Sequence, residues 1–220
     1  MKPKKNWKPN EIIEILDEAY ARPPQQVSRD PMFELILTVL SQHTSDHNSG
    51  EAMHRLLEKF PSWELILSSE VAELEEAIRP GGLAPTKSKR ITSILREIAD
   101  RNDSFDLSFL EFIPLTEARD WLLSLPGVGP KTAACVLLFA LGRPVLPVDT
   151  HVERVSKRLG LIPANMTAEK AHVELEESVP PKDIYAYHMD LIQHGRRTCH
   201  ARNPACEACP LTDKCPRIGL

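Results

Sequence analysis

The stretch Leu125-Pro-Gly-Val-Gly-Pro-Lys-Thr-Ala133 predicts a sharp turn between two helices, one ending near Leu123 and one running from Thr132 to Leu141. Gly127 and Gly129 let the backbone turn sharply and present successive N–H groups at the start of a helix. An ordinary helix–helix turn would use the same glycines. Lys131, however, lies at the mouth of the second helix, beside the place where those N–H groups would bind a phosphate oxygen.

The rest of the chain has the same helical character. Apolar residues recur at helical spacing, and no alternating strand pattern interrupts them. The clearest stripes are Phe33, Ile36, Leu37 and Leu40, and Ile91, Ile94, Leu95 and Ile98. Residues that commonly cap helices predict helix starts at Asn10, Asp30, Ser62 and Thr167. We therefore expect an all-α protein of roughly ten short helices joined by short loops.

Composition sets few limits on function. With 220 residues, 42% of them hydrophobic, the chain can bury a sizeable core, and no apolar run is long enough to cross a membrane. The net charge of −4 does not by itself indicate a nucleic-acid partner. Its distribution is uneven: residues 60–78 hold five glutamates and no Lys or Arg, whereas residues 86–90 hold three cations. A solvated surface is the ordinary interpretation of such runs.

Four cysteines lie close together near the C-terminus, at Cys199, Cys206, Cys209 and Cys215, spaced C-x6-C-x2-C-x5-C. Free thiolates in such a group belong in a reducing compartment, which favours the cytoplasm and disfavours a disulfide framework. Four soft ligands on a short segment can surround either an iron–sulfur cluster or a tetrahedral zinc ion. The spacing alone leaves both metals open.

Asp149 lies eighteen positions after Lys131, in the stretch Val148-Asp-Thr-His151. An aspartate at this place predicts a helix N-cap, where its carboxylate accepts backbone N–H bonds and stays ionised. Held this way, it could face the lysine of a preceding helix across a cleft.

The glycine-rich turn, the Val148-Asp-Thr-His stretch and the cysteine spacing, in this order, resemble endonuclease III of the helix-hairpin-helix DNA glycosylase superfamily. The resemblance extends from about Pro31 to Cys215. It implies a two-lobed all-α fold: a six-helix lobe over 28–143, and a second lobe built from 1–27 and 144–220. It also implies that the cysteine loop, 199–215, binds a [4Fe–4S] cluster rather than zinc, and that the protein is a monomer that binds damaged double-stranded DNA near the nucleoid.

The resemblance also implies an activity. Lys131 would attack the sugar of a flipped-out nucleotide as a nucleophile, with assistance from Asp149. The Schiff base formed would permit β-elimination, so that one lysine serves both glycosylase and lyase steps. Damaged pyrimidines, above all oxidised ones, are the expected substrates. The alternatives are a uracil or thymine glycosylase for mismatches with guanine, and a non-catalytic DNA-binding protein that senses redox state.

DNA contacts are implied at several further positions. Gln42 would fill the gap left by the flipped base, and Leu83 would insert beside the unpaired partner base. The turn of Gly127, Val128 and Gly129, with Thr132 and His151, would contact the backbone. Two positions depart from the family: Ala84-Pro85 stands where an aromatic and a polar residue are common, and Pro130 replaces a frequent arginine.

Overall fold

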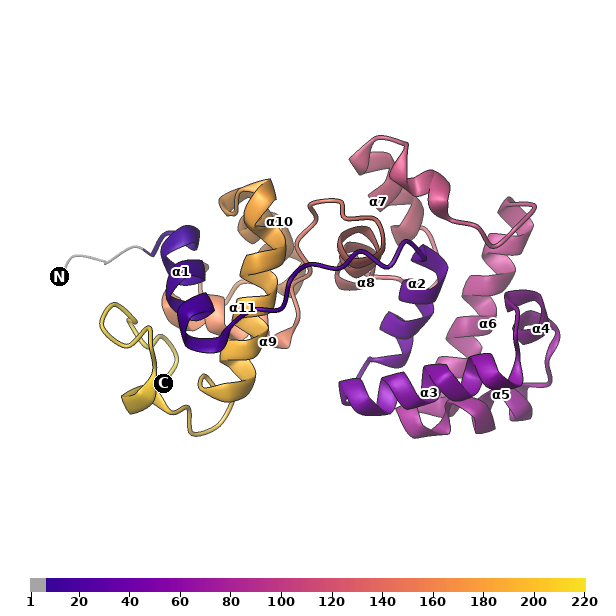
Figure 1. Ribbon diagram of the computed structural model, residues 1–220, viewed down its shortest axis with the longest axis horizontal. Helices are drawn as coiled ribbons and strands as arrows, with labels where there is room; N and C mark the ends of the chain where they lie inside the picture. Colours follow the sequence, from indigo (N-terminus) through magenta and orange to yellow (C-terminus); the bar gives the residue numbers. More distant parts are fainter. Residues whose placement is uncertain (1–6) are drawn as a thin grey trace. The chain divides into compact units, whose positions relative to one another are not determined.

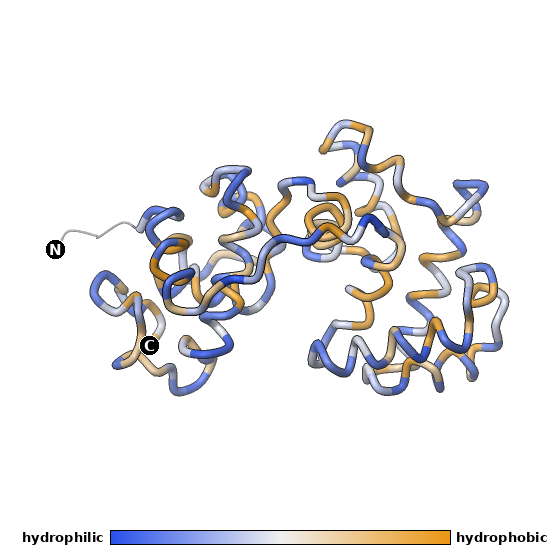
Figure 2. Tube along the Cα trace, in the orientation of Figure 1, coloured by the Kyte–Doolittle hydropathy of each residue, from blue (hydrophilic) through white to orange (hydrophobic). Residues whose placement is uncertain are grey.

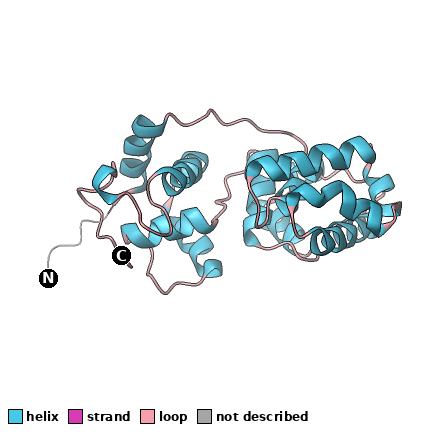
Figure 3. Cartoon of the chain, turned by 90° about the horizontal axis from the view of Figure 1, so that it is seen from below, coloured by secondary structure: helices cyan, strands magenta, loops and turns pink. Residues whose placement is uncertain are grey.

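The computed structural model describes residues 7–220, and every regular element in this part of the chain is helical (Figure 1 and Figure 3). The prediction of an all-α protein is confirmed, with eleven α-helices in the described residues. No described helix combines the length and the apolar character that a membrane crossing requires. The first six residues of the predicted N-terminal segment lie outside the described part.

The chain folds as two compact units, one made of Val27–Arg143 and the other of the residues up to Gln26 with Pro144–Leu220. The first unit contains α2 (Pro31–Leu40), α3 (Asp46–Lys59), α4 (Trp63–Ser68), α5 (Val71–Ile78), α6 (Ala84–Arg101), α7 (Leu115–Leu123) and α8 (Pro130–Cys135). The second contains α1 (Pro9–Tyr20), α9 (Thr150–Leu159), α10 (Ala168–Ser178) and α11 (Ile184–Arg197). The first unit thus contains seven α-helices, of which α4 is a short helix of six residues capped by Ser62.

Apolar stripes build the core of the unit 27–143 (Figure 2). On α6 the predicted stripe is confirmed, since Ile91, Ile94, Leu95 and Ile98 are all fully buried. On α2 the predicted stripe is only partly right. The helix packs against α3, α6 and α8, so that its buried residues extend around the axis. They are Pro31, Met32, Leu35, Ile36, Thr38, Val39 and Leu40, whereas Phe33 and Leu37 are half-buried.

Helix starts follow the capping residues in three of four predicted places. Asp30, Ser62 and Thr167 accept hydrogen bonds from the first turns of α2, α4 and α10. The fourth prediction, Asn10, is wrong. Here α1 begins at Pro9 after Lys8, because proline suits the first helical position.

In the second unit α11 packs against both α1 and α9. Tyr187, in the first turn of α11, is fully buried, and its hydroxyl group lies 3.2 Å from the Ser156 hydroxyl of α9. Burial raises the pKa of this phenol far above its usual range, so the group stays neutral. The C-terminal end of α11 leads directly into the cysteine loop, which therefore starts from a fixed position.

Candidate functional site

The glycine-rich turn joins α7 to α8. As predicted, α7 ends at Leu123, but α8 begins at Pro130, two residues earlier than expected, because proline takes the first helical position. Gly127 has a φ of +74°, and a Cβ placed there would lie 2.7 Å from Nε of Arg90. The left-handed backbone therefore favours glycine at this position, and the adjacent Arg90 side chain would have to shift for any larger residue.

The helix after the turn is shorter and less regular than predicted. The segment Val136–Ala140 continues α8 as a π-helix, and the Arg143 N–H closes it with a hydrogen bond to the Leu137 carbonyl. Cys135 is buried and packs as a small apolar residue. The buried apolar residues of the segment Val136–Ala140 therefore fix the position of α8.

Lys131, in the first turn of α8, is half-buried. The carboxylate of Glu34, on α2, interacts electrostatically with it. Burial raises the pKa of the Glu34 carboxyl above its usual range, while a hydrogen bond from Thr38 and the charge of Lys131 act in the opposite direction. Glu34 thus places a half-buried carboxyl group within electrostatic range of the Lys131 amine.

The expected DNA contacts of this unit differ in accessibility. Val128 and Thr132 have buried side chains, so only their backbone groups can reach a ligand. The Gln42 carboxamide accepts a hydrogen bond from Nη1 of Arg90 and is half-buried. Leu83, by contrast, is 55% exposed and sits in the left-handed conformation with a φ of +50°. An exposed leucine held in a costly backbone conformation is the strongest local sign of function among them.

Asp149 is the N-cap of α9, as predicted. Its Oδ1 accepts hydrogen bonds from the N–H groups of His151 and Val152, at 2.9 and 2.8 Å. Burial lowers the pKa of His151, so this imidazole is neutral near pH 7. Nη2 of Arg154 lies 3.1 Å from its Nδ1. The turn therefore presents an oriented carboxylate beside a neutral imidazole.

Lys131 belongs to the unit 27–143 and Asp149 to the other. Each is held by its own helix start, and their approach to each other remains a prediction.

The four cysteines of the C-terminal loop line one pocket. Its walls also include Val155 and Leu159 of α9 and His194 of α11. Four soft thiolates around an apolar pocket fit an iron–sulfur cluster in the chemistry of their donor atoms.

Two arginines of α9 hold this loop. Arg158 is 8% exposed, and its guanidinium donates hydrogen bonds to the carbonyls of Cys199, His200 and Ala201 and to the Cys199 sulfur. Arg154 donates to the Cys199 carbonyl as well. Such contacts orient ligands and compensate their negative charge.

A polar chain also leads from α1 to the cluster ligands. The Tyr20 hydroxyl lies 2.9 Å from Nδ1 of His194, whose Nε2 lies 3.7 Å from the Cys209 sulfur. His194 is buried and faces the cysteines.

Several of these residues were missed by sequence reasoning. Glu34 could have been found, because it is the only charge in α2. Lys87 could also have been found, since it continues the stripe of Ile91, Ile94 and Ile98 backwards by one turn. Its burial corrects the interpretation of residues 86–90 as a solvated run. The arginines of α9 gave no such signal.

Comparison with known proteins identifies the family to which this chain belongs. Residues 36–181 match the model of the HhH-GPD superfamily of base excision DNA repair proteins, and residues 199–215 match the iron–sulfur binding domain of endonuclease III. Endonuclease III of Thermotoga maritima is 33% identical over 206 residues, which cover 93% of this chain and 92% of that protein. The chain belongs to the endonuclease III family. It therefore carries the [4Fe–4S] cluster predicted for Cys199, Cys206, Cys209 and Cys215, and the zinc alternative is not supported.

Solved structures agree with this family membership. A trapped endonuclease III–DNA covalent intermediate is 31% identical and superimposes with a TM-score of 0.81 over 94% of both chains. A thermostable thymine-DNA glycosylase, 21% identical, shares the fold with a TM-score of 0.78. Longer plant relatives also match: the chain spans 64% of one from Arabidopsis thaliana and 10% of one from rice.

Proposed function

We propose that this chain removes oxidised pyrimidine bases from double-stranded DNA with Lys131 as nucleophile and Asp149 as its assisting carboxylate. Membership of the endonuclease III family makes it a DNA glycosylase of base excision repair in the class that combines glycosylase and lyase activity. The substrate, the residue roles and a monomeric state in the nucleoid belong to the proposal. So does the division of labour in which each unit supplies one catalytic residue.

The chemistry follows from the groups present. The uncharged amine of Lys131 attacks C1′ of the sugar, and the bond from C1′ to the base breaks with its electron pair leaving on the base. Asp149 stabilises the positive charge that develops on the sugar and accepts a proton from the attacking amine. Ring opening gives a Schiff base between Lys131 and C1′. Loss of a C2′ proton then expels the 3′ phosphate and nicks the strand.

The observation that carries the proposal is the environment of Lys131. Lys131 lies in the first turn of a helix, after a turn in which Gly127 has a left-handed backbone. Its amine interacts with the carboxylate of Glu34. A lysine serving only as a surface phosphate contact needs neither the tight turn nor a half-buried carboxylate. DNA contacts are proposed for Gln42, Leu83, the backbone of residues 127–129 and of Thr132, and His151.

The test is borohydride trapping on a duplex that carries one thymine glycol, with wild type compared with Lys131→Ala. We expect a covalent protein–DNA adduct with the wild type only, because borohydride reduces the Schiff base. Lys89→Ala is the matched control, since it removes an exposed lysine from the same unit. An adduct that persists in Lys131→Ala would exclude this lysine as the nucleophile. An adduct on a bare abasic site but not on thymine glycol would exclude the proposed lesion.

A further inference from the structure

A lysine side chain is buried in the unit 27–143 without taking part in the proposed chemistry. Lys87, in the first turn of α6, is 3% exposed, and its Nζ donates hydrogen bonds to the carbonyls of Leu40 at 2.7 Å and Gly81 at 2.8 Å. Burial lowers the pKa of its ammonium group. Lysine is almost never buried unless its charge is compensated, so these two carbonyls account for its place.

Both carbonyls precede residues that are proposed to enter DNA. Leu40 is the last residue of α2 and lies two residues before Gln42. It directly precedes the segment that we call the Gln42 turn (residues 41–45). Gly81 lies two residues before Leu83, in the Leu83 turn (residues 79–83). One ammonium group thus joins two turns that are about forty residues apart in the sequence, each immediately upstream of the side chain in question.

The junction around this ammonium group is tightly packed. A Cβ on Gly81 would lie 3.2 Å from Cβ of Ala52 and 3.6 Å from the Leu40 carbonyl oxygen. The Leu83 carbonyl accepts hydrogen bonds from the N–H groups of Thr86 and Lys87, both at 3.0 Å. The backbone of Lys87 therefore also fixes the left-handed Leu83, whose side chain remains exposed.

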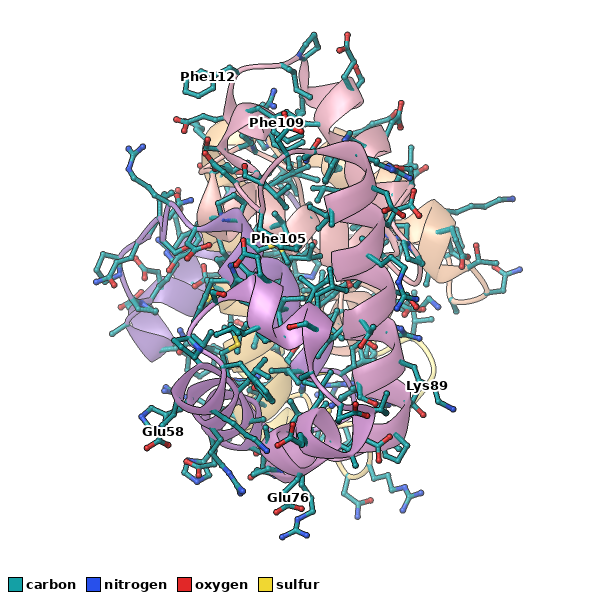
Figure 4. All side chains as sticks on the ribbon, turned by 90° about the vertical axis from the view of Figure 1, so that its right-hand side faces the viewer. Glu58, Glu76, Lys89, Phe105, Phe109 and Phe112 are labelled. Carbon is teal, nitrogen blue, oxygen red and sulfur yellow. The ribbon has the colours of Figure 1, made fainter. Side chains whose placement is uncertain are left out.

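The next turn of α6 adds a second link. Arg90 donates to Oε1 of Gln42, and the same side chain lies against Gly127 in the glycine-rich turn. Lys89, between the two, projects outward from α6 (Figure 4). Of the three cations in residues 86–90, two thus point inward and connect loops, and only Lys89 remains as a surface charge.

We propose that Lys87 is a positioning residue that holds the Gln42 turn and the Leu83 turn at one spacing, so that both side chains enter the duplex at the same base pair. The proposal rests on the proposed function, in which a nucleotide is flipped from the stack. Lys87 acts through the two turns and touches neither the DNA nor the reacting atoms.

The experiment compares Lys87→Met with Lys89→Met and the wild type. Methionine keeps the length of the stem and removes the hydrogen-bond donors. Three quantities are measured: excision of thymine glycol from a duplex in a single turnover, the fluorescence of 2-aminopurine next to the lesion, and cleavage of a single-stranded oligonucleotide that carries an abasic site. The third reaction needs the catalytic lysine but has no partner strand to displace.

For Lys87→Met we expect excision from the duplex to be about 10 to 100 times slower, the magnitude that misplacement by about 1 Å produces. The 2-aminopurine signal should fall with it, while cleavage of the single strand stays at the wild-type rate. Lys89→Met should match the wild type in all three. Wild-type excision by Lys87→Met would overturn the proposal, and so would an equal loss of both reactions in a protein that is still folded.

Two further variants keep the test decisive if Lys87→Met does not fold. Gly81→Ala brings a Cβ to 3.2 Å from Cβ of Ala52, which displaces the Leu83 turn relative to α3 and leaves the ammonium group intact, so it should show the same selective loss. In a Leu83→Ala background this change should slow excision less than it does in the wild type, because one of the two positioned side chains is already missing. Unchanged excision in Gly81→Ala, or full additivity with Leu83→Ala, would overturn the proposal. A wild type that neither excises thymine glycol nor cleaves abasic sites would reject the proposed function itself.

Discussion

Residues 84–101 and residues 199–215 both fix functional loops, but they do so by different means. The first segment is α6, an 18-residue helix that buries four isoleucines and leucines and extends Lys87 and Arg90 to neighbouring turns. The second has a single 3-10 turn, Cys206–Ala208, as its only regular element, and Leu211 is its one fully buried apolar side chain. Its shape comes from hydrogen bonds of Arg158 and Arg154 and from its cysteines.

This difference shows which interactions each region can lose. The turns around α6 rest on an apolar core that folds without any ligand, so a mutation there shifts a loop. The cysteine loop buries too little apolar surface to offset the entropy of ordering its backbone. We therefore expect the cluster to supply folding free energy for this loop, as structural metals do in small domains.

The largest effect is expected on removing one cluster ligand. Cys206→Ser should abolish the broad visible absorbance and destabilise the cysteine loop with the unit that contains it by roughly 3 to 5 kcal/mol, the range typical of a lost structural metal. Thermal unfolding followed by circular dichroism measures this, and the midpoint should fall by about 10 °C.

Cys135→Ala is the matched control for this change. Cys135 is buried on α8 in the other unit, so the variant should keep its colour and lose little stability. A colourless Cys206→Ser protein with wild-type stability and activity would contradict the view that the cluster shapes the loop.

An intermediate effect is expected for Arg158→Met. The change leaves the carbonyls of Cys199, His200 and Ala201 without their donor, at a cost of about 1 to 3 kcal/mol for each group that stays buried. We expect cluster loss in air to become several times faster, measured from the decay of visible absorbance. Arg202→Met removes an exposed arginine of the loop and should decay like the wild type. Equal rates for both variants would show that the thiolates alone hold the loop.

The sequence predicted the elements that depend on local patterns. The three capping residues, the end of α7 at Leu123 and the stripe of α6 could all be predicted, because each depends on residues within one or two turns. Burial of a long polar side chain depends on which distant groups compensate it. The sequence therefore suggested a surface run for Lys87, although the carbonyl of Leu40 lies 47 residues away along the chain.

The candidate site shows the same limit. The family resemblance brought Lys131 and Asp149 to attention, and the capping role of Asp149 followed from its local sequence. The link of Gln42 to Arg90 and the carboxylate of Glu34 beside Lys131 arise from helix packing, which no spacing encodes. The π-helical segment after Cys135 likewise reflects packing of an apolar helix whose period alone predicts a regular one.

The smallest effect is expected on the pH dependence of stability. In the unit that holds the cluster, the carboxyl group of Asp190 is fully buried on α11, where Arg22 binds its Oδ2, and its Oδ1 has no partner among the described residues. Burial raises the pKa of Asp190 from 3.8 to about 7, although Arg22 acts in the opposite direction. The folded protein then keeps a proton that the unfolded chain releases above about pH 4.

The stability contributed by this group is therefore complete below about pH 4 and is lost as the pH rises to about 7. Asp190→Asn should flatten the dependence of the unfolding free energy on pH in this window, by about 2 to 4 kcal/mol. Asp17→Asn is the control, because Asp17 binds the same arginine with a side chain that is 45% exposed. Urea unfolding at pH 4.5, 6 and 7.5 decides the matter. A wild type whose stability rises over this range, and does so equally in Asp190→Asn, would show that Arg22 keeps the buried carboxylate ionised.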